Sequence, residues 1–146
     1  MIITLKNVRD YFKKNGIVRQ RVYGFNNVNK YRLLKTVNVK LSDGNIIVIP
    51  EGYEWDLASV PRLLWGIVPP DSDAELAFLI HDYLYENQIN SRKWADAEML
   101  KWSIVTNGTQ DWSIRNVDNY IRYWAVRLGG QKAWRSCSIK PYFLKQ

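Results

Sequence analysis

The chain has 146 residues, one cysteine and a net charge of +7, with 47% hydrophobic and 14% aromatic residues. This length suits one domain with a core of its own, and the aromatic content argues against a disordered chain. The single cysteine, Cys137, excludes an internal disulfide framework and a cysteine-cluster metal site. No apolar run approaches the roughly 20 residues of a membrane span, so we expect a soluble protein made in the cytoplasm.

The charges are segregated along the chain. Residues 1–40 carry ten basic residues and one acidic residue, residues 41–100 carry three and eleven, and residues 101–146 carry eight and two. Blocks of this kind give a folded protein oppositely charged regions. Two interpretations stay open. Either the basic ends bind an acidic partner, or they pair with the acidic middle of the same fold.

The first half of the chain has the pattern of β-strands. We predict a strand around residues 17–23 and another at the opening residues. Residues 37–41 alternate apolar and polar side chains, which is the pattern of a half-buried strand. Asp43-Gly44 then favours a tight hairpin, because glycine adopts positive φ without steric cost, and the return strand spans residues 46–49.

The second half has the pattern of helices. Ser72 and Glu75 fit a capping box at the start of a helix that continues to about residue 86. Its apolar side chains surround most of the helix, so we expect it to be buried and central. Ser91 is the expected N-cap of a second helix that ends at about residue 105.

A third helix is predicted from Ile114 to about Leu128, where Gly129-Gly130 ends it. Strands followed by helices predict an α+β fold, with an N-terminal antiparallel sheet packed on a C-terminal bundle of about three helices. We expect a single domain over residues 1–146. Its first 50 residues are mainly β with a basic N-terminal part, residues 51–130 are mainly helical, and residues 131–146 form a basic, aromatic tail.

Three short polar motifs lie between residues 56 and 96. They read Asp56-Leu-Ala-Ser59-Val-Pro61, His81-Asp82-Tyr-Leu-Tyr85 and Ser91-Arg-Lys-Trp-Ala-Asp96. His81 is the only histidine in the chain. If the protein has a reactive site, we expect it here.

His81 is a candidate general base or metal ligand, because imidazole titrates near neutral pH. With Asp56 and Asp96 it would form a His/carboxylate set suited to zinc, manganese or iron. Asp82 completes the set of candidate catalytic residues. Neighbouring residues on a helix point about 100° apart, so His81 and Asp82 cannot both face the same partner. We expect one of them to be a supporting or structural residue.

A structural interpretation of the same residues stays open. His81 would be a buried imidazole that braces the central helix against the 56–61 loop. Asp56 with Ser59 and Pro61 would form a capped turn, and Asp96 would form an i,i+4 pair with Arg92. Tyr85 and Ser91 belong to these motifs as structural residues.

A separate candidate surface combines basic and aromatic side chains near the two ends of the chain. Such side chains grip phosphates and stack on bases, and they also anchor protein interfaces. The candidate partner-binding residues are Arg19, Arg21, Lys132, Trp134, Arg135, Lys140, Tyr142 and Phe143.

Together with Pro69-Pro70 and the late Ala125-Val-Arg-Leu-Gly129-Gly130, the three motifs resemble a small domain family of unassigned function that is common in tailed bacteriophages and prophages. The resemblance covers residues from about 45 to 130. Many members carry Thr where this chain has Trp55, so no hydroxyl role is expected there. The resemblance implies a phage gene product but supplies no reaction.

We therefore expect a virion-associated or assembly component of the tail, baseplate, neck or capsid region that docks to other phage virion proteins. It would be made in the host cytoplasm and, if structural, would reside in the virion, with a homo-oligomer or ring as one expected form. Two alternatives stay open. One is a small hydrolase with a divalent metal that acts on cell-wall or nucleotide substrates. The other is a nucleic-acid-binding protein, whose affinity would fall steeply with salt.

Overall fold

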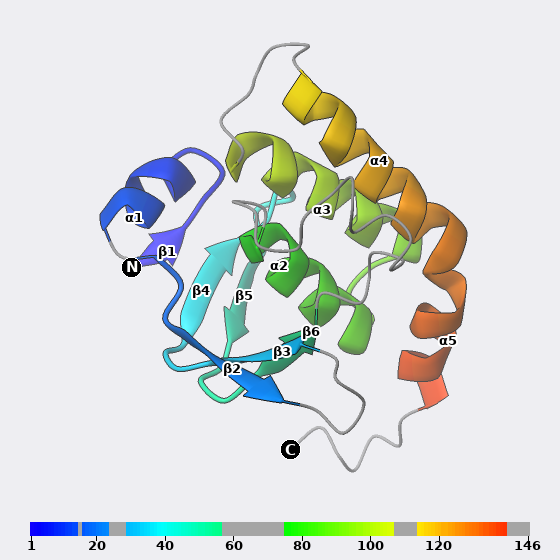
Figure 1. The fold of residues 1–146 in the computed structure, drawn as a ribbon, viewed down its shortest axis with the longest axis horizontal. Helices are drawn as coiled ribbons and strands as arrows, with labels where there is room; N and C mark the ends of the chain where they lie inside the picture. The colour runs from blue at the N-terminus through cyan, green and yellow to red at the C-terminus, as the bar shows by residue number, and fades with distance from the viewer. Residues whose placement is uncertain (15, 24–28, 57–74, 107–113, 140–146) are drawn as a thin grey trace.

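The computed structural model describes residues 1–14, 16–23, 29–56, 75–106 and 114–139, and it shows two small sheets beside a layer of helices (Figure 1). The first sheet has the order β1-β4-β5, from β1 (Ile2–Ile3), β4 (Val37–Lys40) and β5 (Ile46–Ile49). The second has the order β2-β3-β6, from β2 (Arg19–Tyr23), β3 (Asn29–Leu33) and β6 (Glu54–Asp56). The helices are α1 (Val8–Lys14), α2 (Glu75–Glu86), α3 (Arg92–Thr106), α4 (Ile114–Gly129) and α5 (Gln131–Ile139). The predicted α+β class is confirmed.

The first sheet follows the alternation of its sequence. Val37 and Val39 on β4 are buried, while Asn38 and Lys40 point outward, as predicted. The hairpin to β5 turns at Gly44, whose φ is 94°. β5 buries Ile47 and Ile49 and leaves its two other apolar residues exposed.

The opening strand pairs differently from the expected antiparallel sheet. β1 runs parallel to β4, with Ile2 opposite Asn38. Two parallel neighbouring strands need a long crossover connection, whereas antiparallel strands can be joined by a short hairpin. Here α1 and the β2–β3 hairpin form that crossover, so residues 1–50 include one helix as well as strands.

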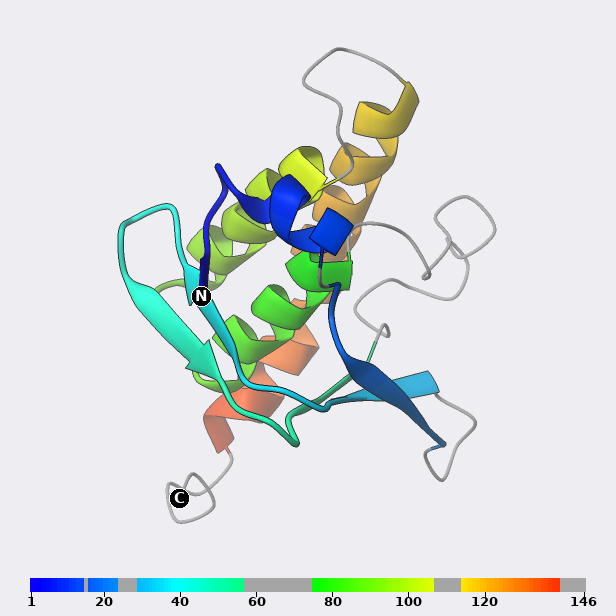
Figure 2. The ribbon, with the colours of Figure 1, turned by 90° about the vertical axis from the view of Figure 1, so that its left-hand side faces the viewer.

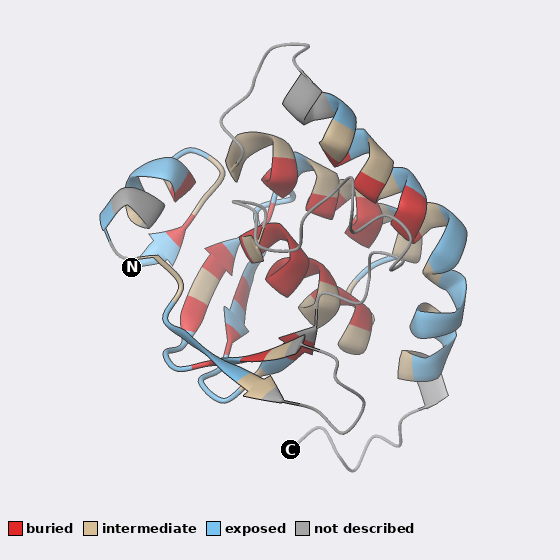
Figure 3. Ribbon diagram, in the orientation of Figure 1, coloured by how far each residue is buried: buried red, intermediate tan, exposed pale blue. Residues whose placement is uncertain are grey.

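The central helix of the fold is α2, as predicted. Figure 3 shows most of α2 as buried, and its buried residues include both apolar side chains and His81. α3 packs against α2 on one side and α4 on the other. In Figure 2 the first sheet therefore lies on one side of the α2–α3 layer and α4 on the opposite side.

The described C-terminal residues, 75–106 and 114–139, form four helices, where about three were predicted. Gly129 ends α4 as predicted, but the expected tail begins as a further helix, α5. α5 packs against α2, mainly through Trp134, whose ring stands 5.0 Å from that of Tyr85 in an edge-to-face contact. Among the described side chains of α5, Trp134 and Cys137 are partly buried and the others are exposed.

Candidate functional site

A buried carboxylate, Asp96 on α3, is the centre of a polar cluster between the helices. Its Oδ1 atom lies 2.8 Å from His81 Nε2 and accepts a hydrogen bond of 2.5 Å from the Tyr85 hydroxyl. Its Oδ2 atom accepts a hydrogen bond of 2.7 Å from Nη1 of Arg127, on α4. We call His81, Tyr85, Arg92, Asp96 and Arg127 the Asp96 cluster.

The spacing of the motifs explains how these side chains meet. His81 and Tyr85 are four residues apart on α2, so they share the helix face that points to α3. Arg92 and Asp96 have the same spacing on α3, and their closest charged atoms are 3.8 Å apart. The predicted N-cap is confirmed, because the Ser91 hydroxyl accepts a hydrogen bond of 3.2 Å from the Trp94 backbone N–H.

Arg92 connects the cluster to the end of α4. Its guanidinium donates hydrogen bonds to the backbone carbonyls of Val126, at 3.3 Å, and Arg127, at 3.1 and 3.2 Å. These carbonyls belong to the last turn of α4, where helical N–H partners run out. The Val126 carbonyl also accepts a hydrogen bond of 2.8 Å from the Gly130 backbone N–H. Arg92 therefore caps α4 as well as neutralising Asp96.

Gly130 lies against the same cluster. A Cβ atom at this position would stand 2.7 Å from the Tyr85 hydroxyl oxygen and 2.5 Å from the Val126 carbonyl oxygen. Both distances are shorter than a carbon–oxygen contact allows. The glycine pair of the late motif thus permits the close approach of the α4–α5 junction to α2.

The pKa values of the two central groups move apart. Burial alone would raise the pKa of Asp96, but hydrogen bonds from His81, Tyr85 and Arg127 outweigh it and hold the pKa below its usual range. Burial alone would lower the pKa of His81, but interaction with Asp82 and Asp96 outweighs it and raises the pKa. Asp96 is therefore ionised at neutral pH, so the hydrogen at His81 Nε2 is donated to it.

The second ring nitrogen of His81 has a different environment. Nδ1 is 3.7 Å from Asp82 Oδ1 and has no hydrogen-bond partner in the part of the chain that the structure describes. The imidazole is only 1% exposed. Asp82 and Asp96 therefore flank the ring from opposite sides, and one of them acts on each nitrogen.

The predicted metal set is only partly brought together. His81 and Asp96 touch, but Asp96 already accepts from three donors and lies against Arg127, which disfavours a cation there. Among the residues described, no group of three His, Cys, Asp or Glu side chains could hold a metal ion. The side chain of Asp56, with Ser59 and Pro61, lies outside the described residues. The metal site stays a prediction.

The candidate partner-binding residues have varied environments. Arg19 forms an ion pair with Glu75, and its guanidinium carbon stands 4.5 Å from the centre of the Tyr31 ring. Arg21 lies farther from the same ring, at 5.9 Å. Trp134 packs on Tyr85, whereas Lys132 and Arg135 are exposed on α5. Lys140, Tyr142 and Phe143 lie outside the described residues.

The segregated charge blocks meet at several points in the fold. Arg19 with Glu75 and Arg32 with Glu54 pair the N-terminal block with the acidic middle. Arg127 with Asp96 pairs the C-terminal block with the same middle. Part of the segregation is therefore internal to the fold.

A second buried carboxylate, Glu98, was not anticipated from the sequence. It accepts hydrogen bonds from the Ser42 backbone N–H at 2.7 Å, the Ser42 hydroxyl at 2.5 Å and the Trp102 indole N–H at 3.0 Å. Glu98 thus joins α3 to the β4–β5 hairpin. Its spacing of four residues from Trp102 is the one signal in the sequence that could have indicated it.

An exposed apolar stripe runs along α4. Val117, Tyr120, Trp124 and Leu128 are 57%, 47%, 58% and 82% exposed. Val117, Trp124 and Leu128 are apolar residues at the helical spacing that predicts this helix. The opposite face of α4 buries Asn119, Arg122, Ala125 and Val126. The apolar side chains whose spacing predicts this helix therefore face mainly solvent rather than the core.

The comparisons with known proteins identify a family. A family model described as a protein of unknown function, DUF1353, matches residues 31–126. The chain belongs to this family. The matched range includes α2 and α3, and thus His81, Tyr85, Arg92 and Asp96 of the Asp96 cluster. No curated protein and no solved structure matches the chain.

The length and the apolar content of a helix decide whether it can cross a membrane. Across the described helices, none combines the length and the apolar content that a bilayer crossing requires.

Proposed function

We propose that this protein is a phage-type virion-associated or assembly component that docks to another virion protein through the exposed face of α4. The observation that supports this proposal is the stripe of Val117, Tyr120, Trp124 and Leu128. Exposed apolar patches of this kind mark interaction sites, whereas singly scattered apolar residues do not. The spacing of three, four and four residues places all four side chains on one helix face.

The composition of the stripe fits a protein partner. Trp and Tyr are enriched among the residues that dominate binding energy, because they bury much area at little cost in side-chain entropy. Trp124 lies near the middle of the stripe, between Tyr120 and Leu128, which is where such anchors concentrate. A helix face of this kind is recognised by an apolar groove or a second amphipathic helix.

The charge around the stripe favours an acidic partner. Residues 114–139 carry five basic side chains and one acidic side chain, Asp118. Of the basic ones, Arg122 is buried and Arg127 pairs with Asp96, whereas Lys132 and Arg135 are exposed on α5. A second copy docked through the same face would bring these positive charges together, which is unfavourable. We therefore expect a different protein, with an apolar contact surface bordered by Asp and Glu. The phage context comes from the resemblance of the motifs to a family common in tailed phages.

The test compares two pairs of apolar-to-polar substitutions in the phage that encodes the protein. Trp124→Gln with Leu128→Gln is expected to weaken docking at least 30-fold, which corresponds to about 2 kcal/mol for a hot spot. The incorporation of the protein into particles, measured by quantitative mass spectrometry, should fall accordingly. Ile46→Gln with Val48→Gln removes exposed apolar residues from β5 and is the matched control.

Normal incorporation of the α4 variant would contradict the proposal, provided that its unfolding free energy matches the wild type. An equal loss in the β5 control would also contradict it, because the effect would then not belong to α4. Point substitutions are preferable to deletion of the C-terminal tail, since deletion would remove Trp134 from its contact with Tyr85.

One observation favours a second candidate, a hydrolase with a divalent metal. A metal-binding histidine commonly donates one ring N–H to a carboxylate while its other nitrogen faces the metal. His81 has part of this arrangement, with Nε2 on Asp96 and with Nδ1 3.7 Å from Asp82 Oδ1 and without a hydrogen-bond partner among the described residues. In this candidate, Asp96 positions the ring and does not bind the metal itself.

Metal analysis tests the second candidate. After incubation with Zn²⁺ or Mn²⁺ and dialysis, the hydrolase predicts about one equivalent of metal in the wild type. His81→Ala and Asp56→Asn should each lose it while circular dichroism shows that the helices are retained. A wild-type protein that binds no metal would rule this candidate out.

A further inference from the structure

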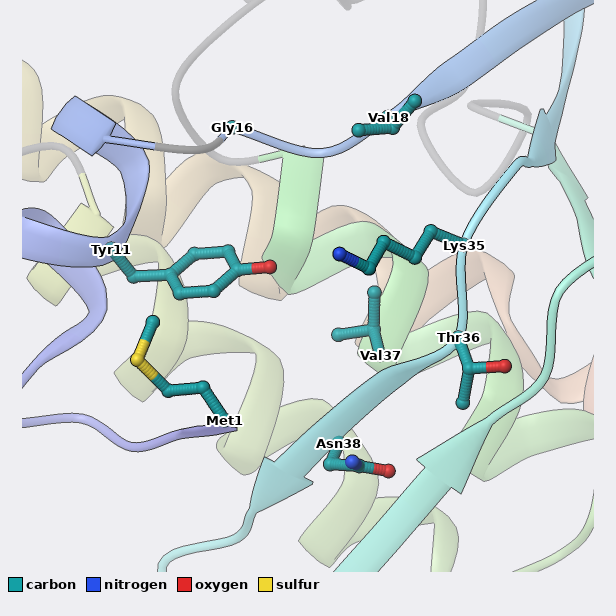
Figure 4. Close-up of a pocket in the computed structure, with 8 residues that line it drawn as sticks. All are labelled: Met1, Tyr11, Gly16, Val18, Lys35, Thr36, Val37 and Asn38. Atoms are coloured by element: carbon teal, nitrogen blue, oxygen red, sulfur yellow. The ribbon is translucent and has the colours of Figure 1, made fainter.

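A small pocket lies where the start of the chain meets β4, well away from the Asp96 cluster. Its volume is about 230 Å³. Figure 4 shows the eight residues that line it, which are Met1, Tyr11, Gly16, Val18, Lys35, Thr36, Val37 and Asn38. They come from the residue before β1, from α1, from the segment before β2, and from β4 with the residues before it.

Two polar groups point toward each other across this pocket. Figure 4 shows the Tyr11 hydroxyl and the Lys35 ammonium group directed to its centre. Both groups donate hydrogen bonds, and an ammonium group can do nothing else. The Thr36 hydroxyl is directed away (Figure 4), and it accepts a hydrogen bond of 3.2 Å from the Glu51 backbone N–H.

The charge of the lining selects a negative ligand. Among the described residues that line the pocket, Lys35 has the one charged side chain and none is acidic. Asp10, which precedes Tyr11, is exposed on α1 and is not part of the lining. A carboxylate at the centre would accept a hydrogen bond from the Lys35 ammonium group and would lie beside the Tyr11 ring, and charge-assisted bonds of this kind are the strong ones.

The rest of the lining selects the shape of the ligand. The apolar part of the lining comes from the buried Val37 and from Met1 and Val18, which are 76% and 50% exposed. The volume is below the 300–1,000 Å³ of pockets for drug-sized ligands, so a nucleotide would not fit inside. A short hydrocarbon stem would contact this apolar part of the lining while the carboxylate meets Lys35.

We propose that this pocket binds a small carboxylate group on a short apolar stem, as in a short-chain carboxylic acid or an acidic side chain of another molecule. The proposal is independent of α4 and of the Asp96 cluster, because the pocket shares no residue with either. It adds a ligand site to a protein for which docking is proposed elsewhere.

Butyrate is the probe for this site, and ¹H–¹⁵N NMR of the full chain is the readout. Saturable shifts at the backbone amides of residues 35–38, with a dissociation constant in the millimolar range, are the expected result. Lys35→Gln should weaken binding about tenfold, because it removes the charge-assisted bond.

Three comparisons make the test specific. Lys40→Gln removes an exposed lysine from the same strand outside the pocket and should leave butyrate binding unchanged. n-Butanol keeps the stem without the charge and should bind at least tenfold more weakly. Inorganic phosphate keeps an anion without the stem and should also bind more weakly.

Shifts that do not saturate, or an equal loss in Lys40→Gln, would overturn the proposal by showing non-specific attraction to lysines. Phosphate that binds as tightly as butyrate would overturn the assignment to a carboxylate with an apolar stem.

Discussion

Replacing Asp96 by Asn is expected to lower the free energy of unfolding by about 3–5 kcal/mol. Asp96 is fully buried, and the substitution leaves Arg127 and His81 without the negative charge that they contact at 2.7 and 2.8 Å. Removing one partner of a buried ion pair lowers the free energy of unfolding by more than the pair contributes to it, because the remaining charge stays buried without water or a partner. Urea denaturation followed by circular dichroism measures the change.

The matched control is Glu51→Gln, the same acid-to-amide change at an exposed position. Its effect should stay within about 0.5 kcal/mol, as for other surface substitutions. If both variants lose similar stability, or if Asp96→Asn loses less than about 1 kcal/mol, the cluster does not support the fold as described.

The pH dependence of stability gives an independent check on the cluster. The raised pKa of His81 stabilises the fold fully below its unfolded value of about 6.5, and this contribution is lost as the pH rises through the folded pKa. The lowered pKa of Asp96 gives a contribution to stability with the opposite pH dependence. Its contribution is present above about 3.9 and is lost as the pH falls through the folded value. In Asp96→Asn, the decline above neutral pH should shrink.

Replacing Gly130 by Ala is expected to destabilise the protein by about 1–3 kcal/mol, the usual cost of overpacking. The added methyl would overlap the Tyr85 hydroxyl and the Val126 carbonyl, at 2.7 and 2.5 Å. Relief requires α5 to move away from α2, which would also disturb the contact between Tyr85 and Trp134. Thermal and urea unfolding of the variant measure the effect.

The neighbouring glycine provides the control. A Cβ atom at Gly129 meets nothing within 4 Å, so Gly129→Ala should be neutral or slightly stabilising through the higher helix propensity of alanine. Combining Gly130→Ala with Tyr85→Phe should cost less than the sum of the single changes, since the hydroxyl oxygen is then absent. Equal effects at positions 129 and 130 would contradict the close approach.

The motifs that carry the family resemblance acquire a common explanation in the fold. His81 and Tyr85 come from the second motif, Ser91, Arg92 and Asp96 from the third, and Arg127 with Gly130 from the last. All contribute to one buried cluster, to its helix caps or to the close packing around it. The motifs of this region therefore describe how α2, α3 and the α4–α5 junction are held together.

Local structure was determined largely by the sequence itself. The alternation around Val37 to Leu41, the turn at Gly44, the Ser91 cap and the end of α4 at Gly129 all follow from backbone preferences and short-range periodicity. The same spacing places His81 with Tyr85, and Arg92 with Asp96, on one face of their helices. These features depend on contacts within a few residues.

Only the tertiary structure decided what each face meets. Periodicity placed Val117, Trp124 and Leu128 on one side of α4, but only packing shows that α3 covers the other side and leaves this one in solvent. Asp96 could have been an exposed partner of Arg92 or a metal ligand, and it became the buried acceptor for three donors because α2 and α4 approach it from two sides. Burial and charge pairing depend on residues far apart in the chain, and no local pattern records that proximity.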